Sequence, residues 1–124
     1  MKSNSRTKGA WGEKVAADYL TKKGYVVLAT GFRSRFGEID IVANSKEYLT
    51  ITEVKTRKSS RFAEAKEFVG KEKQKKIIKT TEYYLLKHPT KLQPRFDVIE
   101  IYAKDGVLTA TPEIVHIENA FGSN

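Results

Sequence analysis

The order of helical and strand patterns along the chain is the feature that most constrains its fold. Apolar residues recur at helical spacing over residues 10–23 and Lys71–Lys87, and Gly24 and Pro89 follow these segments closely. Period-two alternation bounded by turn residues predicts strands at 25–29, 37–43, 48–56, 96–102 and 114–117. The chain therefore reads as helix, three strands, helix, strand, strand.

This order predicts an α/β fold: a single-domain sandwich with a central mixed β-sheet flanked by helices. Residues 44–47 are short enough to join two antiparallel strands in a hairpin, and Asp105-Gly106 is a hairpin turn signal before a final edge strand. The helix at 71–87 is long enough to be the crossover to a parallel strand. Because 124 residues with 40% hydrophobic content can bury one core, we expect one domain over residues 1–124, with residues 1–8 as a flexible arm.

Composition narrows the function classes. No apolar run approaches the roughly 20 residues needed to span a bilayer, and no signal-peptide pattern follows the polar start, so we expect a cytoplasmic protein without a membrane partner. The chain has no cysteine and two histidines, which excludes disulfides, thiolate catalysis and cysteine-ligated zinc. Any bound metal would have to be held by carboxylates.

Carboxylates interrupt the apolar patterns of the two central strands. In residues 37–43, strict alternation predicts one side formed by Glu38, Asp40 and Val42 and the other by Ile39, Ile41 and Ala43. In residues 48–56, an apolar side continues into Glu53 and Lys55. Burying a lone carboxylate costs several kcal/mol, so Glu53 needs a partner, a metal ion or a proton. A salt bridge with Lys55 is one explanation and a shared metal ion is the other.

Two features favour the metal ion. A hairpin can bring Asp40 and Glu53 close enough to share one hard cation, and Mg²⁺ prefers oxygen ligands. Glu13 falls inside the apolar arc of the first helix, so it should point towards the sheet. Three carboxylates aimed at one region would repel one another strongly unless a cation neutralised them.

Positive charge is concentrated in one stretch. The net charge is +8, and residues 55–79 carry ten lysines and arginines against three glutamates. Such a concentration favours a polyanion partner, although a solvated lysine-rich helix has the same composition. Helical spacing turns Lys73 and Gln74 towards the sheet, where they can line the site, and turns Lys75 and Lys79 away from it. A buried amide bonded to backbone explains Gln74 equally well.

Seven short motifs are spread over the chain. They are G-x-x-G-E-x-x-A at 9–16, K-K-G-Y at 22–25, G-E-I-D at 37–40, E-V-K-T-R at 53–57, K-Q at 73–74, R-F-D-V at 95–98 and H-x-x-x-A-F at 116–121. Together they resemble the YraN-like family of bacterial proteins, which is similar to the PD-(D/E)XK superfamily of restriction-endonuclease-like nucleases. The chain departs from the family pattern at Gly31, where asparagine is usual, and at Thr52, where an apolar residue is usual.

The resemblance implies a metal-dependent nuclease that hydrolyses phosphodiester bonds in DNA or RNA, with DNA favoured. Asp40 and Glu53 would coordinate Mg²⁺ or Mn²⁺, and Glu13 would add a contact to the metal or to its ligands. Lys55 would orient or deprotonate the attacking water and stabilise the charged phosphorane. The sequence leaves open whether cleavage is internal or from an end, and whether the protein is a homodimer.

The residues expected to contact nucleic acid come from the basic stretch. They are Arg57, Lys58, Arg61, Lys73, Gln74, Lys75 and Lys79. Two other classes of function are compatible with the same composition. One is a non-catalytic nucleic-acid-binding module of the same fold, and the other is an assembly protein whose basic face meets an acidic protein.

Overall fold

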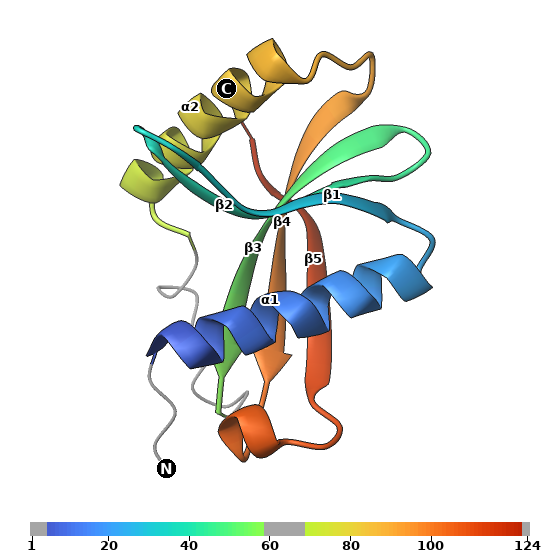
Figure 1. Ribbon diagram of the computed structural model, residues 1–124, viewed down its shortest axis with the longest axis vertical. Helices are drawn as coiled ribbons and strands as arrows, with labels where there is room; N and C mark the ends of the chain where they lie inside the picture. The colour runs from blue at the N-terminus through green and yellow to red at the C-terminus, as the bar shows by residue number, and fades with distance from the viewer. Residues whose placement is uncertain (1–4, 59–68, 123–124) are drawn as a thin grey trace.

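The computed structural model describes residues 5–58 and 69–122, and in these residues two α-helices cover opposite faces of a five-stranded sheet (Figure 1). The elements are α1 Ser5–Lys22, β1 Val26–Ser34, β2 Gly37–Asn44, β3 Tyr48–Arg57, α2 Lys71–Lys87, β4 Gln93–Tyr102, the short 3₁₀ helix η3 Gly106–Leu108 and β5 Glu113–Phe121. The predicted restriction-endonuclease-like α/β sandwich is confirmed. Neither α-helix in the described ranges has the length and apolar content needed to cross a membrane.

The sheet is mixed, with strand order β1-β2-β3-β4-β5. Neighbouring strands pair antiparallel except β3 and β4, which are parallel and aligned from Tyr48–Gln93 to Arg57–Tyr102. The chain reaches β4 from β3 through α2, so the predicted crossover helix is confirmed. The hairpin of β2 and β3 is also as predicted.

Each face of the sheet buries its own hydrophobic cluster. The cluster on the α2 face contains Ile39, Val42, Leu49, Ile51, Val69, Ile77, Tyr84, Phe96 and Val98. The cluster on the α1 face contains Ala16, Leu20, Ile41, Ala43, Ile99 and Ile101. Strands β2 and β4 contribute residues to both clusters, so they lie in the middle of the sandwich between the two helices.

Two elements are longer than predicted. Helix α1 begins at Ser5, five residues earlier than expected, and so takes in part of the segment 1–8. Strand β1 continues past Ala29 to Ser34, because it pairs with β2 as far as Ser34–Gly37. That pairing holds polar residues in strand conformation, which no apolar alternation could have revealed.

The predicted hairpin turn at Asp105-Gly106 is wrong. Strands β4 and β5 are joined by residues 103–112, and Gly106, although its φ is 59°, begins the helix η3. The backbone nitrogen of Asp105 donates to Thr109 Oγ1 at 2.9 Å, and the nitrogen of Thr109 donates to the Gly106 carbonyl at 3.0 Å. These local bonds close a wider turn than the two-residue one.

A buried ionic network joins the edge strand β5 to β4. Asp97 is fully buried, and its two oxygens accept hydrogen bonds from Arg95 at 2.8 and 2.9 Å and from the backbone nitrogen of Asn119 at 3.0 Å. His116 Nε2 lies 2.8 Å from Asp97 Oδ2. Burial, the largest single influence, opposes ionisation, but the bonds from His116 and Arg95 keep the Asp97 pKa below its usual range.

Replacing Asp97 by asparagine should therefore destabilise the protein by about 3 kcal/mol, because the largely buried Arg95 would lose its buried partner and keep only the more exposed Glu118, at 3.6 Å. Urea unfolding near neutral pH measures this loss. Asp18→Asn is the matched control, since its ion pair with Lys14 joins side chains that are 61% and 77% exposed. The control should change stability by about 0.5 kcal/mol or less. Equal losses in the two variants would contradict a stabilising role for the network.

Candidate metal and active site

The site lies where β2 and β3 separate. Their pairing runs from Asn44–Leu49 only as far as Ile41–Thr52, and beyond it β2 pairs with β1 alone. In the opening, the backbone nitrogen of Val54 donates a 2.8 Å hydrogen bond to Asp40 Oδ2. The Asp40 side chain thus accepts a hydrogen bond from a backbone N–H of β3 that lies beyond the last residue pair of β2 and β3. This bond fixes the Asp40 carboxylate at the junction.

The strict alternation predicted for β2 is wrong at Ile39. Ile39 packs with Val42 in the cluster on the α2 face, whereas Ile41 and Ala43 belong to the α1 face. The alternation breaks between Ile39 and Ile41, where β2 stops pairing with β3 and pairs with β1 alone. Ile41 and the residues after it belong to the central sheet, whereas Ile39 follows the twist of the β1–β2 hairpin. Asp40 lies between the two orientations, at the opening.

Three carboxylates meet at this point. Ligand oxygens of Glu13 from α1 and of Glu38 and Asp40 from β2 all lie within 4.8 Å of one another. Glu38 is a candidate ligand that was not expected from the sequence, although its two-residue spacing from Asp40 on a strand was the available signal. Helix α1 turns Glu13 towards the sheet, as its helical spacing suggested.

Gly31 lies beside these carboxylates, and its backbone conformation rather than its size is what favours glycine there. A Cβ atom at this position would lie 3.5 Å from Glu38 Oε1 and 3.8 Å from Glu13 Oε1, and the φ of Gly31 is 61°. Glycine and asparagine are the residues that best tolerate this left-handed conformation. The departure from the usual asparagine therefore keeps the backbone conformation that the site needs.

Glu53 lies beside Asp40 on β3 but pairs with α2. Its side chain is 3% exposed, and Oε2 lies 3.0 Å from Lys73 Nζ. Oε1 is buried and has no hydrogen-bond partner among the described residues. The ion pair of Glu53 is thus with Lys73 and not with Lys55, two residues along the same strand.

Burial, more than mutual repulsion, makes Glu53, Glu13 and Asp40 costly to ionise. Burial raises the pKa of Glu53 to about 7, and the charge of Asp40 adds to the effect. Burial also raises the pKa of Glu13 to about 7, with contributions from Asp40 and Glu38. Burial raises the pKa of Asp40 as well, against the opposing hydrogen bond from Val54. The nearby lysines do not offset the cost of ionising these carboxylates.

Lys55 has the opposite shift. Burial lowers its pKa, and the positive charges of Lys73 and Arg57 lower it further. Burial also acts to lower the pKa of Lys73, but the charge and hydrogen bond of Glu53 outweigh this and raise it. Two lysines a short distance apart therefore differ in character: Lys73 is a fixed cation, and Lys55 releases its proton more readily.

The donor set fits a hard divalent cation. Every candidate ligand is a carboxylate oxygen, which Mg²⁺ and Mn²⁺ prefer. The buried Glu53 Oε1 nearby is an acceptor without a hydrogen-bond partner among the described residues. A cation would also offset the negative charges of Asp40 and Glu38, which add to the effect of burial on these pKa values. Asp40, Glu38 and Glu13 are the residues that would hold it, with Glu53 adjacent.

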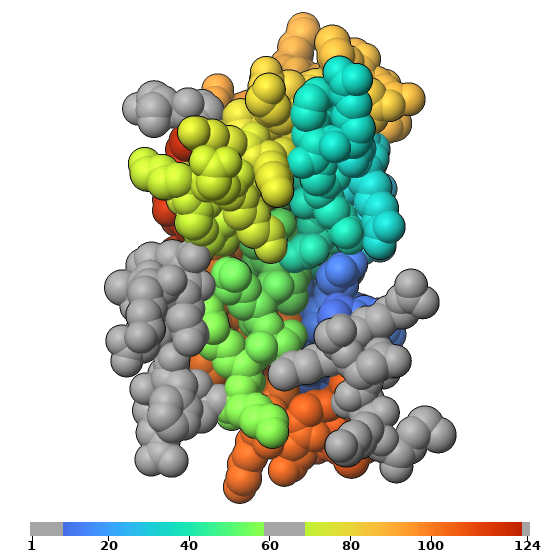
Figure 2. Space-filling model, turned by 90° about the vertical axis from the view of Figure 1, so that its left-hand side faces the viewer, coloured from blue at the N-terminus to red at the C-terminus, as the bar shows by residue number. Residues whose placement is uncertain are grey.

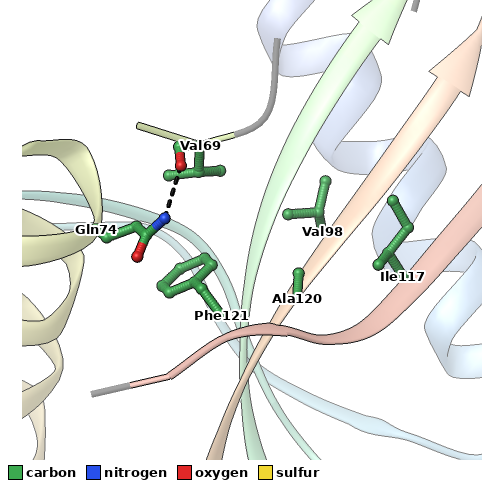
Figure 3. Close-up of a pocket in the computed structure, with 6 residues that line it drawn as sticks. All are labelled: Val69, Gln74, Val98, Ile117, Ala120 and Phe121. Carbon is green, nitrogen blue, oxygen red and sulfur yellow. Dashed lines mark hydrogen bonds between the residues drawn. The ribbon is translucent and has the colours of Figure 1, made fainter. Parts of the chain in front are cut away.

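The predicted nucleic-acid contacts that the structure describes come from the end of β3 and from α2. Gln74 Nε2 donates to the Val69 carbonyl at 2.7 Å, beside a small apolar pocket that residues of β5 help to line (Figure 3). Gln74 thus bonds to backbone, as the alternative has it, although its side chain is half-buried. Lys73 reaches the site, where it forms the ion pair with Glu53. Arg61 lies outside the described residues.

The remaining basic residues lie on two different elements. Arg57 is largely buried at the end of β3, where its Nε is 3.1 Å from Glu100 Oε2, and Lys58 is exposed next to it. Lys75 and Lys79 are exposed on α2, as their helical spacing predicted, with Lys75 Nζ 3.7 Å from Glu72. Lys79 approaches the β1–β2 hairpin and not the carboxylates.

The raised pKa of Glu53 predicts a pH dependence of stability in a chelating buffer. The folded-state pKa, about 7, exceeds the ordinary 4.5, so the folded protein binds more protons between these values. The stabilisation is complete below pH 4.5 and is lost as the pH rises through 7. For Glu53 alone the loss is about 3 kcal/mol at most.

Glu53→Gln should remove the Glu53 part of this dependence and leave the part due to the raised pKa of Glu13. Urea unfolding in a chelator would show similar stabilities for the variant and the wild type at about pH 5 and a more stable variant at about pH 8. Glu82→Gln, which neutralises an exposed carboxylate on α2, is the matched control and should follow the wild type. If the wild type and Glu53→Gln lost the same stability between about pH 5 and pH 8, a raised pKa of Glu53 in the folded protein would be contradicted.

The chain matches the Uncharacterised protein family UPF0102 over residues 12–101, a range that contains Glu13, Asp40, Glu53 and Lys73. It is 45% identical over 121 residues to a UPF0102 protein of Caldanaerobacter subterraneus subsp. tengcongensis, covering 97% of this chain and 98% of the relative. Identity to a UPF0102 protein of Clostridioides difficile is 41% over 119 residues, covering 95% and 99% of the two chains. A UPF0102 protein of Persephonella marina is 43% identical over 115 residues, covering 92% of each chain. The protein therefore belongs to the uncharacterised family UPF0102, the YraN-like family that its motifs resemble.

Proposed function

We propose that this protein is a metal-dependent nuclease that hydrolyses phosphodiester bonds in nucleic acid. One observation carries the proposal: oxygens of Glu13, Glu38 and Asp40 converge within 4.8 Å at a strand junction, next to a lysine whose pKa is lowered. A carboxylate cluster serves a structural purpose poorly, because its repulsion costs stability. Beside a phosphodiester the same cluster is useful only with a cation to offset its charge.

A bound Mg²⁺ or Mn²⁺ would polarise the scissile phosphate and lower the pKa of water in the site. The side chains of the protein have separate tasks around it. Asp40, held by the Val54 backbone nitrogen, keeps one ligand oxygen in a fixed place. Lys55, with its lowered pKa, accepts a proton from the attacking water or donates a hydrogen bond to the phosphate as charge develops. Lys73 holds Glu53 in position.

Exposed lysines supply the attraction for a polyanion. Lys71, Lys75, Lys76 and Lys79 are exposed on α2, the helix that also carries Lys73 into the site. Lysines that neutralise phosphates release counterions, which gives affinity without sequence preference. DNA is the substrate we favour over RNA, and a cleavage panel that contains both would decide between them.

Cleavage should depend on the three groups at the junction. Asp40→Asn, Glu53→Gln and Lys55→Ala should each lower the rate by roughly 100-fold or more. Asp40→Asn removes a metal ligand, Glu53→Gln removes the adjacent buried carboxylate whose Oε1 has no partner among the described residues, and Lys55→Ala removes the proton-transfer group. The assay uses labelled linear, flapped and four-way substrates of DNA and RNA with Mg²⁺ or Mn²⁺. Glu82→Gln is the matched carboxylate control and should retain full activity.

A fully active Glu53→Gln protein would sink this mechanism. Binding without cleavage of any substrate in the panel would instead support the non-catalytic module of the same fold. Circular dichroism of each variant is needed, so that loss of activity is not confused with loss of structure.

Metal binding itself should be visible as stabilisation. Mg²⁺ or Mn²⁺ should raise the melting temperature of the wild type, because a ligand that binds only the folded state stabilises it by mass action. Calorimetry with and without metal should show a much smaller rise for Asp40→Asn. An equal rise in both proteins would place the metal away from Asp40.

A further inference from the structure

The turn between β1 and β2 carries two arginines and a phenylalanine that belong to neither the carboxylate site nor the core clusters. We call residues 33–37 the hairpin tip. Arg33 and Arg35 are exposed, with 80% of the Arg33 side chain accessible, and Phe36 is half-buried. The chain continues directly from the tip into Glu38, so these groups lie at the edge of the proposed active site.

The tip is fixed against α2. Ser34 Oγ lies 3.0 Å from Thr80 Oγ1 and accepts a 3.0 Å hydrogen bond from the Phe36 backbone nitrogen. Gly37 approaches α2 so closely that a Cβ atom there would be 3.3 Å from Lys76 Cβ. The side chains of the tip are therefore presented by a preorganised turn, which reduces the ordering cost of binding a ligand.

Cations from two elements surround the aromatic ring of the tip. The guanidinium carbon of Arg35 lies 5.0 Å from the Phe36 ring centroid, and Lys79 Nζ from α2 lies 5.4 Å from it. Figure 2 shows the hairpin, in cyan, and α2, in yellow, side by side on one face. We call Arg33, Arg35, Phe36, Lys76 and Lys79 the tip surface.

This combination fits an unpaired nucleic-acid strand. Cationic groups track the phosphates of such a strand, while an aromatic ring or an arginine plane stacks on its bases. In a duplex both faces of each base are covered by neighbouring bases, so a stacking platform would have nothing to engage. An acidic protein would be attracted by the charges but would gain nothing specific from Phe36.

We propose that the tip surface binds a single-stranded segment of nucleic acid next to the carboxylate site. An ion pair between Arg33 Nε and Glu38 Oε2, 3.5 Å apart, links the tip surface to the carboxylate site. The binding itself does not depend on catalysis. The consequence that preferred substrates contain an unpaired strand rests on the proposed nuclease function.

The test measures binding to a labelled oligo-dT strand and to a duplex of equal length by fluorescence anisotropy across a salt series in a chelator. Arg35→Gln and Lys79→Gln should each weaken strand binding and flatten its salt slope by about 0.7, the value for one phosphate on a single strand. Phe36→Leu should weaken strand binding by roughly 5- to 150-fold through lost stacking, with an unchanged salt slope.

Helix α2 supplies matched controls. Lys87 Nζ lies 5.2 Å from the Tyr83 ring, nearly the same geometry as Lys79 over Phe36 but farther along the helix. Lys87→Gln and Tyr83→Leu should keep the affinity for the strand within about twofold of the wild type. Thermal melting of every variant verifies that it is folded, and the exposed Arg35→Gln tests the idea even if Phe36→Leu fails to fold.

The tip-surface proposal would be overturned if the Phe36→Leu variant bound the strand as tightly as the wild type, or if the tip and control variants lost equal affinity. Either result would leave the proposed nuclease function standing. Absence of binding to either probe at low salt would also overturn the tip-surface proposal. Tip-dependent binding without cleavage in the substrate panel would overturn the nuclease and leave the tip surface standing, so the two failures are distinguishable.

Discussion

The carboxylate of Asp40 takes the place of a strand partner where β2 and β3 separate. Once the ladder has ended at Ile41–Thr52, the Val54 N–H would lack an acceptor, and Asp40 Oδ2 supplies one at 2.8 Å. The same bond holds the Asp40 side chain in the opening, between Glu53 on β3 and Glu13 on α1. Glu13 from α1 and Glu38 from β2 reach the same point, with ligand oxygens within 4.8 Å of those of Asp40.

The charges gathered there are unbalanced. Glu53 pairs with Lys73 yet keeps a raised pKa, because burial and the charge of Asp40 outweigh the single lysine. Repulsion of this kind makes the metal-free protein less stable than a neutral site would. Stability comes from elsewhere, through the two hydrophobic clusters and the buried network around Asp97 that secures the edge strand.

Local sequence patterns predicted most of the fold but only part of the candidate site. The bounds of α2 and its role as a crossover were predicted, because helical spacing and length are properties of one segment. The extension of β1 and the hairpin tip were missed, because Ser34 and Arg33 are strand residues only through their pairing with β2. Glu38 was passed over as a ligand for a related reason: its meeting with Glu13 requires a helix distant in the sequence.

The sequence by itself determined the α/β class, the basic stretch and the carboxylate chemistry, since periodicity, charge and side-chain type are present in the unfolded chain. Only the tertiary structure decided which groups meet. Lys73 of α2 and not Lys55 of the same strand pairs with Glu53, and Glu13 of α1 meets Glu38 of β2. These choices depend on where β2 leaves β3 and on how closely α2 approaches the sheet, and such distances arise from packing between segments that no local pattern encodes.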